Sequence, residues 1–208
     1  HFESIYDYIS DIGADLINDG DGIFTTCFAE HTFILSLVKA QKMGKSIKAW
    51  IPETRPYLQG AHLTAPSLVE MSIDTTLMSD AMAAHYIDQG DIQRYMSAVD
   101  TLCMDGSAVN KVGTLNNAII CSHFNLPFHV FAISPDPTKQ SALDSVMEER
   151  NPEELLTFEG KRVSAKGVKG VYPAFDRIPS RLISGIITPK GLYAPHQIND
   201  IFNWEGRR

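Results

Sequence analysis

Apolar and polar positions along the chain predict helices and strands that alternate. Apolar residues recur at helical spacing from residue 2 to residue 17, and the turn at 18–22 ends this first helix. Short apolar and β-branched runs predict strands at 23–27, 47–51, 74–78, 94–99 and 127–133. Further helices are predicted between them, at 32–43, 61–71, 80–86 and 112–124. This alternation indicates a doubly wound α/β fold, with a mostly parallel, Rossmann-like sheet and helices on both faces.

The last third of the chain is less regular. Residues 134–150 lack periodicity at first and are charged later, and 160–180 are rich in Gly, Pro and Lys. We expect the second of these segments to be an ordered loop that wraps the sheet edge. Residues 182–188 fit either a late strand or a helix–strand junction, and periodicity does not decide between the two.

Length and charge narrow the class of protein. A chain of 208 residues with 44% hydrophobic and 21% charged residues fits one globular domain with a large core. The formal net charge of -7 argues against a nucleic-acid-binding surface, which needs clustered Lys and Arg. There is no signal-peptide pattern and no apolar run of transmembrane length, so we expect a cytoplasmic protein without a membrane partner.

Cysteine and histidine usage predicts neither disulfides nor a metal site. Three cysteines are spread along the chain without CxxC spacing, and the seven histidines form no HExxH-type pair. Neither a G-x-G-x-x-G fingerprint nor a P-loop occurs, which disfavours a nucleotide-binding domain.

The stretch 99–117 carries the most suggestive chemistry. Asp100 follows a predicted buried strand, and Asn110 and Lys111 precede a predicted helix. A carboxylate at a strand end with an amide and an ammonium at a helix N-terminus is how open α/β sheets hold an anion. Asp100 is therefore an acid or base candidate, and Asn110 and Lys111 are phosphate-side candidates. A turn aspartate, a helix cap and a solvated lysine are the simpler alternatives.

Two other segments fall on the same side of the predicted sheet. Cys27 ends the first strand just before a helix, where a helix dipole favours thiolate, although a cysteine is more often a small buried apolar residue. The loop 53–60, which includes Arg55 and Gln59, packs polar groups between a strand and a helix. Cys103 and Cys121 are assigned to the core, and the histidines to surface or capping positions.

These segments together resemble the methylthioribose-1-phosphate isomerase family. The resemblance is carried by Cys27 after 23–26, by ETRPYLQGAHLTA at 53–65, SDAMAAH at 79–85, Asp100 with GSAVNKVGT at 106–114, PAFD at 173–176 and IITPKG at 186–191. It covers nearly the whole chain in the family's order. The family is similar in fold to the regulatory subunits of the eukaryotic translation-initiation nucleotide exchange factor.

The resemblance implies roles for particular residues. It makes Cys27 and Asp100 the catalytic pair, and Gln59, Asn110 and Lys111 the substrate-binding residues. It also implies no cofactor, a homodimer, a small sugar phosphate as partner, and a place in methionine salvage. Residues 1–208 would form the Rossmann-like catalytic domain, the C-terminal part of a longer architecture whose N-terminal helical domain lies outside this chain.

Four positions depart from the family's usual pattern. Phe28-Ala29-Glu30 follows the cysteine, Thr101 follows the aspartate, Ala81 replaces an Asn, and Tyr172 replaces another. These changes resemble a branch that acts on sugars such as 5-deoxyribose 1-phosphate. Three functions thus stay open: isomerisation of a 5-modified ribose 1-phosphate, isomerisation of ribose 1,5-bisphosphate, and a non-catalytic regulatory or sugar-phosphate-sensing subunit.

Overall fold

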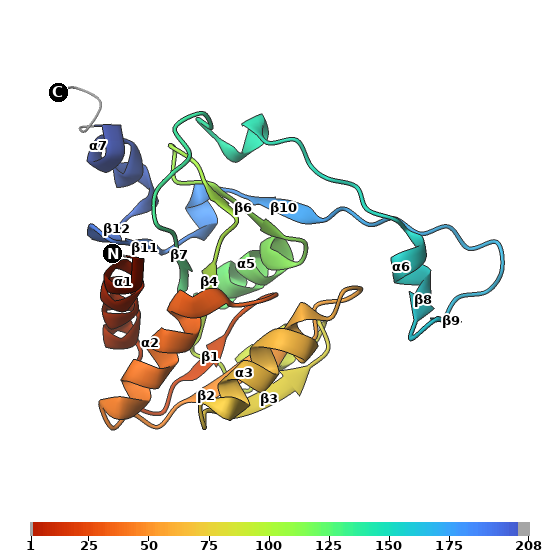
Figure 1. Ribbon diagram of the computed structural model, residues 1–208, viewed down its shortest axis with the longest axis horizontal. Helices are drawn as coiled ribbons and strands as arrows, with labels where there is room; N and C mark the ends of the chain where they lie inside the picture. The colour runs from red at the N-terminus through yellow and green to blue at the C-terminus, as the bar shows by residue number, and fades with distance from the viewer. Residues whose placement is uncertain (1, 204–208) are drawn as a thin grey trace.

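A computed structural model describes residues 2–203, and its centre is a seven-stranded sheet (Figure 1). The strand order is β12-β11-β7-β4-β1-β2-β3. The strands are β1 (Gly22–Phe24), β2 (Lys48–Pro52), β3 (Asp74–Met78), β4 (Arg94–Ala98), β7 (Phe128–Phe131), β11 (Gly185–Thr188) and β12 (Gly191–Tyr193). All neighbours pair in parallel except β12, which runs antiparallel to β11 at one edge. The expected doubly wound, mostly parallel sheet is confirmed.

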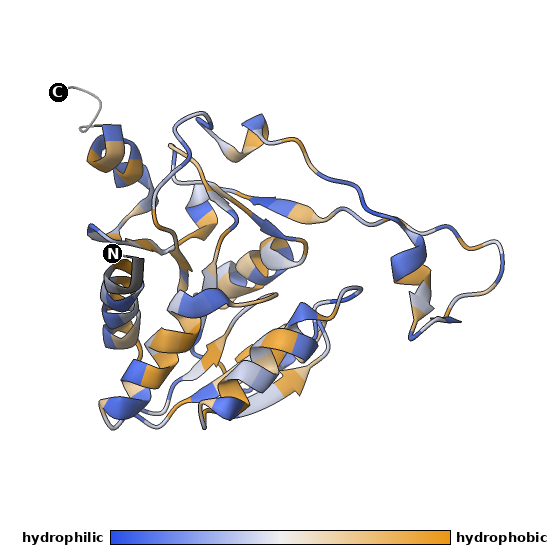
Figure 2. Cartoon of the chain, viewed as in Figure 1, coloured by the Kyte–Doolittle hydropathy of each residue, from blue (hydrophilic) through white to orange (hydrophobic). Residues whose placement is uncertain are grey.

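Helices cover both faces of this sheet. The helices of the described chain are α1 (Phe2–Leu16), α2 (Glu30–Lys42), α3 (Ala65–Glu70), α4 (Ala83–Asp88), α5 (Thr114–His123), α6 (Glu153–Leu156) and α7 (Ile198–Asn203). Buried residues of α1, α2 and α3 share one core cluster, and those of α4, α5 and α7 share another. In Figure 2, α2 and α3 show both orange and blue turns, as amphipathic helices do.

The strands supply the two cores alternately. Ile23 packs into the α1–α2–α3 core while Phe24 packs into the α4–α5 core, and Met96 and Tyr95 divide in the same way. All four side chains are 0% exposed. Because successive side chains of a strand point to opposite faces, a sheet buried on both sides gives the near-continuous apolar runs seen in the sequence.

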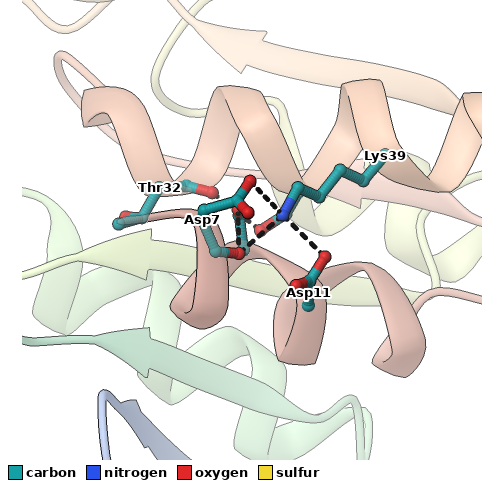
Figure 3. Close-up of polar contacts among 6 residues, drawn as sticks. Asp7, Asp11, Thr32 and Lys39 are labelled. Carbon is teal, nitrogen blue, oxygen red and sulfur yellow. Dashed lines mark hydrogen bonds and ion pairs between the residues drawn. The ribbon is translucent and has the colours of Figure 1, made fainter. Parts of the chain in front are cut away.

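Lys39 on α2 forms ion pairs with two aspartates of α1. The Lys39 ammonium lies 2.6 Å from a carboxylate oxygen of Asp7 and 2.6 Å from one of Asp11 (Figure 3). The Lys39 side chain is 18% exposed, but the two carboxylates are largely in water. Such pairs contribute at most about 1 kcal/mol each, so α1 is held mainly by its apolar face.

A second, three-stranded antiparallel sheet was not expected from the sequence. It has the order β10-β6-β5, with β5 (Thr101–Leu102), β6 (Ala108–Lys111) and β10 (Phe175–Ile178). The expectation that 160–180 wraps the sheet edge is wrong. Part of it forms β10, and the rest belongs to an arm that extends away from the sheet in Figure 1 and carries α6 and the hairpin of β8 (Thr157–Phe158) and β9 (Lys161–Arg162).

Three short 3-10 segments lie in the second half of the described chain. They are the 3-10 turns η2 (Ala142–Asp144), η3 (Ser180–Leu182) and η4 (Pro195–Gln197). Residues 182–188 were expected to be either a strand or a helix–strand junction. The structure has both features, because η3 ends at Leu182 and the strand β11 follows. Within residues 2–203, every helix is too short or too polar to cross a membrane.

The expected helix at 61–71 begins with a π-helical segment, η1 (Gly60–Thr64), that continues into α3. A Cβ atom on Gly60 would lie 1.8 Å from the Pro52 carbonyl oxygen. Glycine is therefore required here, because the loop crosses directly over the end of β2. This close crossing holds the 53–60 loop against the carboxyl edge of the sheet.

Candidate active site at the carboxyl edge of the sheet

The strand order reverses direction between β1 and β4, and both strands end at the same edge. Open α/β sheets bind ligands at this reversal, outside the carboxyl ends of the strands. Cys27 follows β1 and Asp100 follows β4. The fold therefore brings the two residues that were predicted from strand-end positions to the same place.

The Cys27 backbone is held in a left-handed conformation, with a φ of 63°. Its N–H donates to the Thr54 hydroxyl oxygen at 3.1 Å, and its carbonyl accepts from the Thr64 hydroxyl at 2.7 Å. The same Thr64 oxygen accepts from the Ala29 N–H at 3.0 Å. A non-glycine residue in this region is strained, and such strain persists only where the surroundings enforce it. Two threonines enforce it here.

Burial raises the pKa of the Cys27 thiol. A hydrogen bond from the Phe28 N–H and the positive charge of Lys111 lower it, but they do not overcome burial. The expected thiolate is therefore not favoured, and Cys27 is a thiol at neutral pH. Helix α2 starts only at Glu30, whose own carboxylate accepts from the Thr32 N–H at 3.1 Å and neutralises that helix end.

Asp100 lies at the joint between the two sheets, after β4 and before β5. It is exposed on one side, where it lines a cavity of about 510 Å³. Protein on the other side removes enough water to raise its pKa, although Lys111 and Arg150 pull the pKa down. A carboxyl group with a raised pKa suits a general acid.

Asn110 and Lys111 do not lie at a helix N-terminus. Both are buried residues of β6, and α5 begins only at Thr114. The amino end of α5 is occupied by Asp176, whose carboxylate oxygen accepts from the N–H groups of Gly113 at 2.7 Å and Leu115 at 3.0 Å. The expectation that this helix dipole holds a phosphate is wrong, because the protein's own carboxylate already uses it.

Asn110 is built into the polar core between β4 and α5. Its side-chain amide donates to the Ser97 hydroxyl at 3.3 Å and to the Thr114 hydroxyl at 3.1 Å. A second buried group lies on the same side of the sheet, where the Tyr95 hydroxyl is 2.6 Å from Thr26. The two hydrogen bonds of Asn110 fix the end of β6, and therefore the position of Lys111.

Lys111 is 5% exposed, and its ammonium lies 5.0 Å from the ring centroid of Phe175. Burial lowers its pKa, as does Arg150, whereas Cys27, Asp100 and Glu148 raise it. Each of Cys27, Asp100 and Lys111 thus experiences the charge of another, which places the three in one electrostatic environment.

Gln59 stands at the end of the loop over β2. Its side-chain oxygen is buried and has no hydrogen-bond partner among the described residues. A buried acceptor without a partner costs about 1–3 kcal/mol, which a ligand hydroxyl would recover. Within residues 2–203, no hydrogen bond or ion pair joins Gln59 to Cys27, Asp100 or Lys111, so its substrate-binding role stays a prediction.

Sequence reasoning missed Arg150 and the two threonines that hold Cys27. Arg150 changes the pKa of Cys27, of Asp100 and of Lys111. It lies in a charged, aperiodic stretch whose partner residues are far along the chain, so no local signal identifies it. Over residues 2–203, no three His, Cys, Asp or Glu side chains are grouped to hold a metal ion.

The sequence profile of the initiation factor 2 subunit family matches residues 2–195. The chain belongs to this family. Methylthioribose-1-phosphate isomerase of Thermus thermophilus is 38% identical over 166 residues, which cover 79% of this chain and 50% of the relative. The enzyme of the same name from Fervidobacterium nodosum is 39% identical over 197 residues, covering 90% and 56%.

Solved structures of family members have the same fold. The 5-methylthioribose 1-phosphate isomerase of Pyrococcus horikoshii superposes with a TM-score of 0.87 at 31% identity, covering 96% of this chain and 58% of that one. The translation initiation factor eIF-2B subunit delta of A. fulgidus gives 0.85 at 32% identity, covering 93% and 59%. The chain thus spans little more than half the length of these relatives, and the resemblance inferred from the motifs is confirmed.

Family members named as isomerases and as initiation factor subunits have nearly the same backbone. The fold therefore does not decide between catalysis and regulation in this family, and only the side chains at the carboxyl edge can distinguish the two.

Proposed function

We propose that the chain is a cytoplasmic aldose–ketose isomerase. Its substrate would be a ribose 1-phosphate modified at C5, with a methylthio group or hydrogen, and its product the corresponding ribulose 1-phosphate. The supporting observation is that a thiol, a carboxyl group of raised pKa and a buried ammonium influence one another at the β1–β4 reversal. The named relatives act on methylthioribose 1-phosphate, which supports the same substrate class.

Asp100 would open the sugar ring. A phosphate on C1 blocks the anomeric hydroxyl, so the ring opens when the bond between C1 and the ring oxygen breaks and that oxygen gains a proton. Burial raises the pKa of Asp100, which favours the protonated carboxyl group that a general acid needs. Asp100 lines a cavity of about 510 Å³, whose other walls come from α1, α2 and the segment after β7 and not from Cys27, Gln59 or Lys111.

Hydrogen then moves from C2 to C1, by one of two routes. In a proton route, Cys27 would act as a shuttling base, which requires Lys111 to stabilise a transient thiolate. In a hydride route, the hydrogen moves from C2 to C1 with its electron pair, the C2 hydroxyl gives its proton back to the Asp100 carboxylate as the ketone forms, and the Cys27 thiol only shapes the pocket. The raised pKa of Cys27 favours the second route, since the resting group is protonated.

The same proposal includes the substrate-binding residues and the oligomeric state. Gln59, with its unpartnered buried oxygen, and Asn110 and Lys111 would bind the substrate. The homodimer typical of the family is proposed by resemblance, and light scattering of the purified chain measures it.

The test is incubation of the 208-residue chain with ribose 1-phosphates carrying methylthio, hydrogen or phosphate at C5. Proton NMR follows the appearance of the ketose, and running the reaction in D₂O separates the routes, because deuterium at C1 reports the proton route. Tight binding of a sugar phosphate with no turnover of any member of the panel would instead support the sensing subunit, which the superposition on an initiation factor subunit also favours.

A further inference from the structure

Two cations lie against one aromatic ring beside the candidate site. The Lys111 ammonium is 5.0 Å from the ring centroid of Phe175, and the Arg150 guanidinium carbon is 5.8 Å from the same centroid. Arg150 also lies 5.9 Å from the ring of Tyr172. A ring face attracts a cation, but the two like charges still repel each other.

The backbone places Arg150 there independently of its side chain. The Arg150 N–H donates to the Tyr172 carbonyl at 2.8 Å, and the Ala174 N–H donates to the Glu148 carbonyl at 2.8 Å. Phe175 then pairs directly with Lys111 across β10 and β6. Residues 148–150 therefore run beside 172–174 and extend the small sheet toward Lys111.

The carboxylates of Asp100 and Glu148 raise the pKa of Lys111 from a distance, and only Glu148 forms an ion pair with a member of this pair of cations within the described chain. Within the described chain, the Lys111 ammonium has no hydrogen bond or ion pair, and its pKa is lowered by burial and by Arg150. Arg150 pairs with Glu148, which is 52% exposed and accepts from Nε at 2.9 Å and from Nη2 at 3.4 Å. An exposed pair of this kind is weak, and it leaves other guanidinium N–H groups for a ligand.

We propose that Lys111 and Arg150 together form a two-pronged seat for a phosphate monoester, with Arg150 supplied by the arm. This inference rests on the proposed function, because the seat lies beside Cys27 and Asp100. A guanidinium matches phosphate oxygens in a bidentate way, whereas an ammonium acts as a point charge. These two cations would take the phosphate-binding role that was expected of the amino end of α5, where Asp176 already accepts the free N–H groups.

The test measures binding of inorganic phosphate by ³¹P NMR titration at constant ionic strength. Arg150→Gln should raise the dissociation constant about 10- to 100-fold, the usual effect of losing a charged hydrogen bond. Arg150→Lys should restore part of the affinity, because it keeps the charge and loses the fork. The matched control is Arg162→Gln on the same arm, where Arg162 pairs with Glu153, and it should bind phosphate as the unmodified chain does.

Thermal melting of each variant checks that it folds. Unchanged phosphate affinity in Arg150→Gln, an equal loss in Arg162→Gln, or no phosphate binding by the unmodified chain would overturn the seat. If phosphate binding depends on Arg150 but no sugar in the panel is isomerised, the seat stands and the isomerase proposal fails. If the chain isomerises a sugar of the panel but Arg150→Gln binds phosphate normally, the isomerase proposal stands and the seat fails.

Discussion

At the scale of single residues, the surroundings of Cys27, Asp100 and Asp136 shift the pKa values of these groups in different directions. Burial raises the pKa of Cys27 and of Asp100. Asp136 lines the same cavity as Asp100, but hydrogen bonds from Thr138 lower its pKa. Of the two aspartates, Asp100 is therefore the one suited to hold a proton for the substrate.

Asp100→Asn should abolish isomerisation and leave substrate binding measurable. An amide cannot donate a proton to the ring oxygen, and general acid catalysis contributes about 10²- to 10⁴-fold. Proton NMR of ketose formation and calorimetry of sugar-phosphate binding measure the two effects. Asp136→Asn is the control and should retain turnover, because its charged carboxylate has no proton to give. Near-native turnover in Asp100→Asn would show that another group is the acid.

At the scale of elements, the amino-terminal ends of the strands bury a histidine, His129, that takes no part in the candidate site. His129 on β7 is 7% exposed, so the expectation of a surface or capping position is wrong for this histidine, and its Nδ1 atom is buried without a hydrogen-bond partner in the described chain. Burial, with a contribution from Arg94, lowers its pKa from 6.5 to about 4. The folded sheet therefore holds a neutral histidine in a pH range where the unfolded chain holds a charged one.

Stability should fall as the pH drops from about 6.5 to about 4, because the unfolded state binds the proton that folded His129 does not. Each pKa unit is worth about 1.4 kcal/mol, so the loss from this group is at most about 3.5 kcal/mol. His129→Leu should remove this part of the slope when denaturant unfolding is measured across the window. Replacing exposed His123 on α5 with Gln should leave the slope as it was, and an unchanged slope in His129→Leu would refute the assignment.

The main sheet could be predicted from sequence because its evidence is local. Each strand is a short apolar run between turns, and Asp74–Met78 has the predicted bounds. The positions of Cys27 and Asp100 follow from strand ends. The small sheet could not be predicted in this way, because β6 pairs with β10 more than sixty residues later in a segment whose Gly and Pro content indicates a loop.

The site was predicted only in part, for the same reason. Asn110 and Lys111 were expected at a helix end, since the apolar run that follows them is helical. Gly113, with a φ of 101°, forms a left-handed turn that separates β6 from α5. Arg150 reaches the site through hydrogen bonds to residues 172–174, and no short sequence window contains both partners.

At the scale of the whole molecule, the arm is attached to the main body by Arg55. The Arg55 guanidinium donates to the carbonyls of Leu155 and Thr157, both at 3.2 Å, and lies 5.3 Å from the ring of Phe158. The carboxylate of Asp80 accepts from the N–H groups of Thr54 and Arg55 at 2.7 Å each. The loop that supports Cys27 through Thr54 is therefore also the anchor of the arm.

Arg55→Ala should make the arm more sensitive to chymotrypsin, which cleaves beside aromatic residues such as Phe158. Loss of two hydrogen bonds from a charged donor is worth about 1–2 kcal/mol here, which raises the open population about 5- to 30-fold. Mass spectrometry of timed digests gives the cleavage rate. Arg181→Ala changes an exposed arginine outside the arm and serves as the control. Equal cleavage rates in the two variants would show that Arg55 does not anchor the arm.

The division of each strand between two cores has a consequence for insertions and deletions. Adding one residue within β1 would exchange the environments of Ile23 and Phe24, which now fill separate cores at 0% exposure. It would also displace Cys27 relative to Thr54 and Thr64. We therefore expect natural variants of this strand to change side chains freely within a hydrophobic size class and to keep its length constant.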